Sequence, residues 1–246
     1  MHLFAAVPTH SGDMAVETAQ TIVNIQAMIR DRGGKFEFHY QFGSPVSLVR
    51  NALTAAFLMS DAEALLMIDA DQGVFPETVA RMIDLNQPVV GCMIPKRRYD
   101  FSKIRLPATD VDHIIHQASE YAGDIIVDDL GQAEVVNGFA RAAYVGAGVL
   151  LIRRQAFEHL MARYPELEGR CLHGQAYPHL SGAGAWGFFN PLENASGAPI
   201  AEDVSFCLRW RQAGGEIWAD LISPVTHVGR HDFAGIYLDY VEAPRS

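Results

Sequence analysis

The chain has 246 residues, of which 49% are hydrophobic and 20% charged, a mixture typical of a globular protein with a buried core. Its 29 acidic and 19 basic residues give a formal net charge of −10, which argues against a protein that coats nucleic acid through a basic surface. Three separated cysteines without a Cys-x-x-Cys pair argue against a disulfide framework or a thiolate zinc site. The sequence lacks a run of about 18 apolar residues and a signal-like start, so we expect a cytoplasmic protein without a membrane span.

The first half of the sequence alternates between strand-like and helix-like segments. Short apolar runs bounded by turn-forming residues predict strands, whereas apolar residues spaced three or four apart predict helices. Proline at the first helical position and glycine after the last one mark helix ends. In chain order we predict a strand at 3–7, a helix at 13–31, a strand at 36–40, a helix at 47–60, a strand at 64–68, a helix at 76–85 and a strand at 88–93.

The second half is less regular, with short strand patterns and one long segment of low periodicity. That segment, residues 165–200, is rich in Gly, Pro, His and Asn, and a loop of this length is usually functional or disordered. Without an internal repeat or a linker, the alternation predicts one α/β domain with a largely parallel sheet covered on both faces. The predicted elements are strands at 125–127, 134–137, 142–145 and 149–152, a helix at 153–163, a helix at 202–212 and a strand at 216–219.

Polar residues follow three of the predicted strands. In open α/β sheets, ligands bind beyond the carboxyl ends of the strands. Such positions hold 8–10 (Pro-Thr-His), 69–71 (Asp-Ala-Asp) and 95–98 (Pro-Lys-Arg-Arg). Asp69 and Asp71 could hold a hard divalent cation, which would neutralise the phosphates of a nucleotide. Aspartate is also favoured in turns, so the same pair fits a plain turn.

Three further groups stand beside strands or helices of the second half. Gly146 and Gly148 precede an apolar strand, where they would let a ligand approach the backbone or form a tight turn. Glu202 and Asp203 begin a predicted helix, where the helix dipole favours carboxylates and a capping role would explain them. His227 follows the last strand, and a lone histidine is more often structural than a ligand.

Taken in order, these groups resemble the motifs of the GT-A nucleotide-sugar glycosyltransferases, and of family 2-like members in particular. The matching positions are the metal-binding Asp-x-Asp at 69–71, the glycine loop at 146–148, the x-Glu-Asp motif at 201–203 and the C-terminal His227. The stretches 48–53 and 91–96 resemble a bacteriophage and giant-virus branch of these enzymes. The resemblance spans about residues 3–233. It implies a GT-A, Rossmann-like three-layer fold with a mostly parallel central sheet in a single domain, 1–246, with a nucleotide-binding half, 1–95, and an acceptor and donor-sugar half, 96–246.

The resemblance also implies a role for each matching residue. Asp203 would be the base that accepts the proton of an acceptor hydroxyl, with Glu202 orienting the acceptor or the loop, and the transfer would invert the anomeric centre. If Asp203 only holds a sugar hydroxyl, the enzyme would be retaining. The metal, Mn²⁺ or Mg²⁺, would be bound by Asp69, Asp71 and His227, the nitrogen ligand favouring Mn²⁺. The donor, a UDP- or GDP-linked sugar, would contact Pro8, Thr9, His10, Arg50, Asp69, Ala70, Lys96, Gly146 and Gly148, and the acceptor would contact Trp186, Arg97 and Arg98.

The sequence leaves more than one interpretation open for the acceptor and for the type of reaction. Five basic residues between positions 96 and 105 form either a solvated loop or a patch for a diphosphate or an anionic acceptor. The viral resemblance adds a hydroxymethylated DNA base to a glycan as acceptor. The aromatic residues at 186–189 form a lid, a sugar platform or a loop pinned by its own rings. A nucleotidyltransferase is the second alternative. Such an enzyme usually has a Gly-rich basic loop after its first strand, but His10 is the only basic residue in segment 8–12. A non-catalytic nucleotide- or sugar-binding module is the third alternative.

Overall fold

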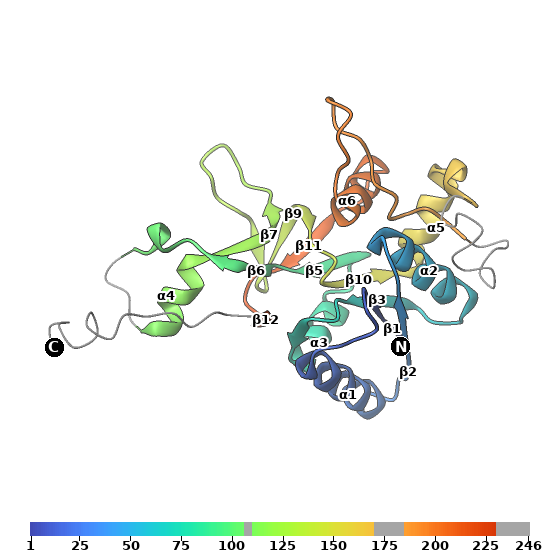
Figure 1. Cartoon of the computed structure of the whole chain (residues 1–246), viewed down its shortest axis with the longest axis horizontal. Coiled ribbons are helices and arrows are strands. Elements are labelled where there is room, and N and C mark those ends of the chain that lie inside the picture. Colours follow the sequence, from blue (N-terminus) through green and yellow to red (C-terminus); the bar gives the residue numbers. More distant parts are fainter. Residues whose placement is uncertain (106–109, 170–184, 230–246) are drawn as a thin grey trace, which may run out of the picture.

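The protein is a three-layer α/β fold, in which a large sheet lies between two layers of helices (Figure 1). The computed structural model describes residues 1–105, 110–169 and 185–229. One face of the sheet is covered by α1 (Val16–Asp31) and α3 (Pro76–Leu85), and the other by α2 (Val46–Met59), α5 (Arg154–Arg163) and α6 (Glu202–Gln212). The predicted α/β class with helices on both faces is confirmed. None of the helices in the described ranges combines the length and apolar character needed to cross a membrane.

The central sheet has ten strands in the order β2-β1-β3-β10-β5-β11-β9-β7-β6, with β8 paired to β9. These are β1 (His2–Thr9), β2 (Lys35–Phe42), β3 (Ala64–Ile68), β5 (Val89–Cys92), β6 (Ile94–Tyr99), β7 (Ser119–Ile125), β8 (Val135–Val136), β9 (Phe139–Val145), β10 (Val149–Arg153) and β11 (Ile217–Asp220). Most strands run in one direction, while β10, β9 and β6 run against them. Strands β10 and β11 lie on either side of β5, so the predicted halves 1–95 and 96–246 share one sheet.

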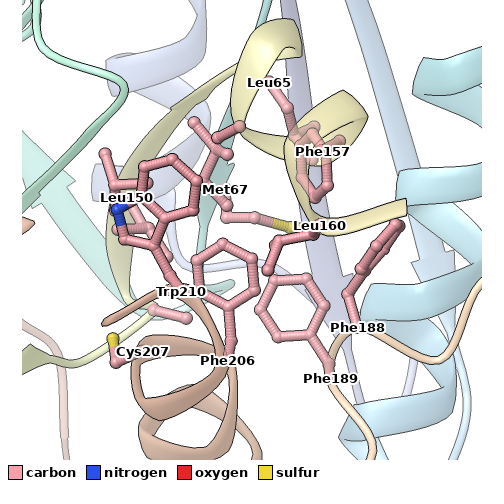
Figure 2. Packing of buried hydrophobic residues seen from close by; sticks show 14 of the residues in the cluster. Leu65, Met67, Leu150, Phe157, Leu160, Phe188, Phe189, Phe206, Cys207 and Trp210 are labelled. Carbon is pink, nitrogen blue, oxygen red and sulfur yellow. The ribbon is translucent and has the colours of Figure 1, made fainter. Parts of the chain in front are cut away.

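Two buried clusters hold the layers together, one on each face of the sheet. All five residues of β3 are buried because helices cover both of its faces. On the side of α2, α5 and α6 the cluster is rich in aromatic rings, and Phe157 packs 5.1 Å from Phe188 and 6.1 Å from Phe206 (Figure 2). Burying such rings is the largest single contribution that side chains make to a core. This packing fixes α6, whose first turn carries the predicted base.

The structure differs from the sequence-based expectation mainly around the basic segment. One interpretation of the sequence places the basic residues in a solvated loop. The structure instead places residues 95–98 in the strand β6. The strand lies at the edge of the sheet, where exposed basic side chains are favoured because they discourage pairing with another chain. Its partner β7 begins at Ser119, before the strand predicted at 125–127, and the helix α4 (Val111–Ala118) was not predicted.

A second, two-stranded sheet was also missed. It pairs β4 (Gln72–Val74) with β12 (Val225–His227), in antiparallel register with Gln72 opposite His227. Both strands have only three residues, too short for a periodic pattern to reveal them. The pairing matters for the site, because it places the end of the Asp-x-Asp motif beside the C-terminal histidine.

The aromatic segment at 185–189 is packed into the core and pinned by polar contacts. Trp186 is only 9% exposed and stacks on Phe188 at 5.7 Å, so the interpretation of a loop pinned by its own rings describes this placement better than a lid or a platform does. Within the long irregular segment, residues 170–184 lie outside the described residues. Asn51 of α2 accepts a hydrogen bond from the Phe189 N–H and donates one to Asn190 Oδ1, both at 2.9 Å.

We expect Asn51→Ala to lower the free energy of unfolding by about 2 kcal/mol, because it leaves the buried N–H of Phe189 without its acceptor. Urea denaturation followed by circular dichroism measures this. Asn24→Ala is the matched control: Asn24 only accepts a surface hydrogen bond from Gln20, and its loss should change stability by less than about 0.5 kcal/mol. Equal stability of the two variants would show that Asn51 does not hold the segment.

Candidate functional site

The candidate site lies where the end of β3, the turn between β9 and β10 and the first turn of α6 meet. The backbone N–H of Asp69 donates to the Gly148 carbonyl at 2.9 Å, which ties the Asp-x-Asp segment to the glycine turn. On the α6 side, the Asp203 carboxylate accepts hydrogen bonds from the backbone N–H groups of Ala147 and Val204. The predicted glycine loop therefore joins the predicted metal-binding segment to the predicted base.

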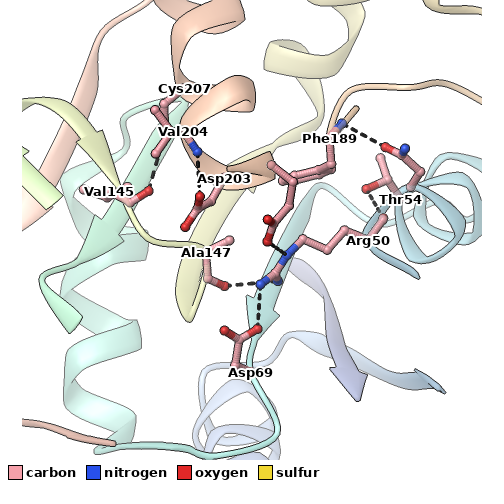
Figure 3. Close-up of polar contacts among 11 residues, drawn as sticks. Arg50, Thr54, Asp69, Val145, Ala147, Phe189, Asp203, Val204 and Cys207 are labelled. Atoms are coloured by element: carbon pink, nitrogen blue, oxygen red, sulfur yellow. Dashed lines mark hydrogen bonds and ion pairs between the residues drawn. The ribbon is translucent and has the colours of Figure 1, made fainter. Parts of the chain in front are cut away.

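Arg50 of α2 is the buried centre of this arrangement, with 3% of its surface exposed. Its Nη2 donates to Asp69 Oδ1 at 2.8 Å, its Nε to Glu202 Oε1 at 3.2 Å and its Nη1 to the Ala147 carbonyl at 3.4 Å (Figure 3). One guanidinium thus contacts all three segments of the site. A planar guanidinium with five fixed donors suits such a bridge, which a lysine could not make.

The charge of Arg50 is maintained by its two carboxylate neighbours. Burial alone would lower the pKa of Arg50, but Asp69 and Glu202 offset this effect and raise the pKa above its ordinary value. The expectation was that Arg50 contacts the ribose or diphosphate of the donor. In the structure the buried guanidinium is engaged with protein acceptors, and its contact with a donor stays a prediction.

Asp71 points to a different partner from Asp69. Its Oδ2 lies 3.3 Å from both His227 Nε2 and Arg97 Nη1, while the Asp71 carbonyl accepts a hydrogen bond from the Val228 N–H at 2.8 Å. In the described part of the chain no three His, Cys, Asp or Glu side chains converge as a metal-binding group. The predicted set of Asp69, Asp71 and His227 is therefore divided, because Arg50 draws the first carboxylate away from the other two side chains.

Asp71 and His227 still fit a divalent cation as a pair of ligands. His227 Nδ1 lies 2.7 Å from the Pro95 carbonyl, to which it can only donate. A neutral imidazole in this tautomer presents the lone pair of Nε2 toward the Asp71 carboxylate. Metal-ligating histidines are commonly oriented in this way by a backbone carbonyl. A carboxylate and an imidazole nitrogen form a donor set that Mn²⁺ accepts.

Asp203 combines partial burial with a neighbouring like charge. Burial raises the pKa of the Asp203 carboxyl above its ordinary value, and the adjacent Glu202 carboxylate raises it further. The N–H of Val204, which donates to Asp203 Oδ1 at 2.7 Å, acts in the opposite direction without reversing the shift. A carboxylate with a raised pKa is a better proton acceptor than an ordinary aspartate once it is deprotonated.

The two glycines of the turn differ in how much room they leave. A Cβ at Gly146 would meet Asp203 Oδ2 at 3.7 Å and Ala122 at 3.5 Å, which is ordinary contact. At Gly148 it would lie 3.2 Å from Ile94 and 3.4 Å from Gln72, a tighter fit. A side chain at position 148 would thus need Ile94 to shift by a few tenths of an ångström, whereas a Cβ at position 146 would fit beside the Asp203 carboxylate.

The other predicted contact residues are spread over neighbouring positions. Pro8 and Thr9 are buried at the end of β1, and His10 is exposed just beyond it. Ala70 accepts a backbone hydrogen bond from Ala15, at the start of α1. Lys96 is exposed on β6, where Arg97 turns to Asp71 and Arg98 pairs with Glu120 on β7.

Sequence reasoning missed Gln72 as part of the site. Its side chain is 1% exposed, its Nε2 lies 3.4 Å from Asp71 Oδ1, and its Oε1 has no hydrogen-bond partner among the described residues. The signal was its position directly after the Asp-x-Asp motif, where a buried amide supports the second aspartate. The pairing of Arg97 with Asp71 left no such signal, because β6 and the turn before β4 are separated by more than a helix in the sequence.

No family model and no curated protein sequence matches the chain. Solved structures similar to it include a protein from the virus STIV, with 13% identity, 94% of this chain and 87% of that chain covered, and a TM-score of 0.47. A Drosophila β-1,4-galactosyltransferase in complex with manganese, UDP-Gal and xylobiose has 14% identity, coverage of 100% and 81%, and a TM-score of 0.46. A UDP-glucose pyrophosphorylase in complex with UDP-glucose has 10% identity, coverage of 92% of both chains and a TM-score of 0.44.

We expect Arg50→Met to lower the free energy of unfolding by about 2–3 kcal/mol, because it leaves two half-buried carboxylates without their shared cation. Arg50→Lys should recover only part of this loss, since an ammonium cannot reproduce the bridge. The control is Arg32→Met, which removes an exposed pair with Asp84 and should cost less than about 1 kcal/mol. If denaturation shows equal losses for Arg50→Met and Arg32→Met, the bridge does not organise the site.

Proposed function

We propose that this chain is a metal-dependent glycosyltransferase, which moves a sugar from a nucleotide-sugar donor to an acceptor hydroxyl. The observation that carries the proposal is the glycine turn between two kinds of carboxylate. On one side the turn is bonded to the Asp-x-Asp segment, and on the other to Asp203, whose pKa is raised. A donor diphosphate needs positive charge, which a cation held near the Asp-x-Asp segment would provide. An attacking hydroxyl needs a base, which Asp203 would provide.

The donor half of the reaction needs a leaving group whose charge is neutralised. A divalent cation, when bound, supplies that positive charge to the diphosphate. Asp71 and His227 are the residues that would hold it, with Pro95 fixing the imidazole. Asp69 contributes through Arg50, which keeps the end of β3 and the glycine turn in place.

In the acceptor half of the reaction, Asp203 acts as the base. Its carboxylate takes the proton of the acceptor hydroxyl as that oxygen forms a bond to the anomeric carbon. The bond between this carbon and the diphosphate oxygen breaks, and its electron pair leaves with the diphosphate. Attack from the face opposite the leaving group inverts the anomeric centre, and a positioned base typically contributes about 10²–10⁴-fold to the rate.

Glu202 and Arg50 keep Asp203 available as a base. The guanidinium hydrogen-bonds to Glu202 and Asp69, and its attraction for Asp203 is a smaller effect than burial or the Glu202 charge. A direct ion pair would have lowered the pKa of Asp203 and weakened it as a proton acceptor. Glu202 therefore acts as the charged neighbour that tunes the base.

Two features favour sugar transfer over nucleotidyl transfer. Residues 8–12 offer no lysine or arginine to a triphosphate, and His10 is the only basic residue there. A base with a raised pKa is also needed for an incoming hydroxyl. For the acceptor we keep a glycan and a hydroxymethylated DNA base as the two expected classes, with Lys96 and Arg98 exposed on β6 for an anionic acceptor.

The test is turnover of UDP- and GDP-linked sugars with Mn²⁺, scored as nucleoside diphosphate released. We expect Asp203→Asn to lower kcat at least about 10²-fold while nucleotide binding persists, and Asp71→Asn to weaken Mn²⁺-dependent nucleotide binding measured by calorimetry. Asp84→Asn, on the surface of α3, is the control and should match the unmodified chain. Near-normal turnover of Asp203→Asn would contradict the base, and nucleoside triphosphate formed from pyrophosphate and a nucleotide sugar would indicate a nucleotidyltransferase.

The pH dependence of kcat provides a separate prediction. A base must be deprotonated, so kcat falls as the pH drops through the pKa of Asp203, and the raised pKa places this fall above the range of an ordinary aspartate. Glu202→Gln removes the like charge and lowers that pKa, so the acidic limb of the profile should move to lower pH. An acidic limb that stays in place or moves to higher pH would show that Glu202 does not tune the base.

A further inference from the structure

We propose that Arg97 is the resident counter-ion of Asp71, and that a divalent cation must displace its guanidinium to bind there. The inference rests on the cation site of the proposed function and adds a competitor that belongs to the chain itself. It gives Arg97 a role different from the acceptor contact expected from the sequence.

Arg97 occupies the position at Asp71 that a cation would need. Its Nη1 lies 3.3 Å from Asp71 Oδ2, the same oxygen that faces His227 Nε2 at 3.3 Å. The other carboxylate oxygen, Oδ1, is 3.4 Å from the amide of the buried Gln72. The carboxylate is thus turned so that one oxygen is shared by the imidazole and the guanidinium.

In its neutral form, His227 has no proton on Nε2 to donate to this oxygen. Because His227 Nδ1 donates to the Pro95 carbonyl, a neutral imidazole presents a lone pair from Nε2 to the carboxylate. Two electron-rich atoms that face each other need positive charge beside them. The guanidinium of Arg97 supplies it in this structure, as a bound cation would.

The absence of a side chain at Gly229 leaves space for the Arg97 side chain. A Cβ at Gly229 would lie 2.4 Å from the Cδ of Arg97, so the arginine stem fills the space that a larger residue would take. Both Pro95 and Arg97 of β6 contact the segment around β12, because the Pro95 carbonyl lies 2.7 Å from His227 Nδ1 and the Arg97 stem lies beside Gly229. Arg98 instead pairs with Glu120 on β7.

Displacement of the guanidinium is favoured by its exposure. The Arg97 side chain is 57% exposed. An exposed ion pair of this kind favours the paired over the unpaired state by a factor of only about two to five. A divalent cation on Asp71 Oδ2 would repel the guanidinium at this distance. Once released, the guanidinium is free to form a forked pair with phosphate oxygens, for which its geometry is suited.

The test measures Mn²⁺ binding without any nucleotide or sugar, from the loss of the electron paramagnetic resonance signal of free Mn²⁺. We expect Arg97→Gln to bind Mn²⁺ about 3- to 10-fold more tightly than the unmodified chain. Arg98→Gln, with the same loss of charge one residue away, should stay within about twofold. Asp71→Asn should bind most weakly, and thermal unfolding checks that each variant is folded.

Three results would overturn the proposal: unchanged or weaker binding by Arg97→Gln, an equal gain in Arg98→Gln, or no Mn²⁺ binding by any folded variant. An equal gain would mean that net charge, and not the place of Arg97, decides the affinity. Because the titration contains no donor, its result is independent of turnover. A chain that exchanges Arg97 for Mn²⁺ but cleaves no nucleotide sugar would retain this inference and lose the proposed function.

Discussion

The buried guanidinium of Arg50 is the contact on which the site depends. It joins the end of β3, the turn before β10 and the first turn of α6 through Asp69, Ala147 and Glu202. Arginine at this depth is stable only when paired, and its two carboxylate partners become unfavourable neighbours without it. The arrangement therefore behaves as a unit, in which the position of each carboxylate depends on the same cation.

That bridge separates the carboxylates into two environments. Asp69 and Glu202 are paired with Arg50, whereas Asp203 is half-buried with a raised pKa and Asp71 is turned toward His227 and Arg97. Under the proposed function, groups of one chemical type thus take different tasks from their surroundings: Asp203 would accept a proton and Asp71 would bind a cation. Such divergence between neighbouring acids is how a site provides both acid–base chemistry and charge stabilisation at a single pH.

The regular part of the fold could be predicted from the sequence, and the contacts of the site only in part. Long periodic helices such as α1 and buried runs such as β3 were found because packing on a sheet imposes those patterns. Strands of three residues, and the basic edge strand β6, leave no periodic signal. The roles of the motif residues stay predictions, and the turn of Asp69 toward Arg50 and the approach of Arg97 to Asp71 depend on tertiary packing between segments distant in the sequence.

The central claim, that Asp203 acts as a base in a single displacement, is tested most directly by the stereochemistry of the first product. The unmodified chain would be incubated with Mn²⁺ and UDP-glucose, UDP-galactose or GDP-mannose, and the anomeric proton of the released or transferred sugar followed by NMR; slow hydrolysis with water as acceptor suffices. The account predicts that the first sugar formed from an α-linked donor is the β anomer, because attack occurs opposite the diphosphate. An α anomer formed first would contradict it.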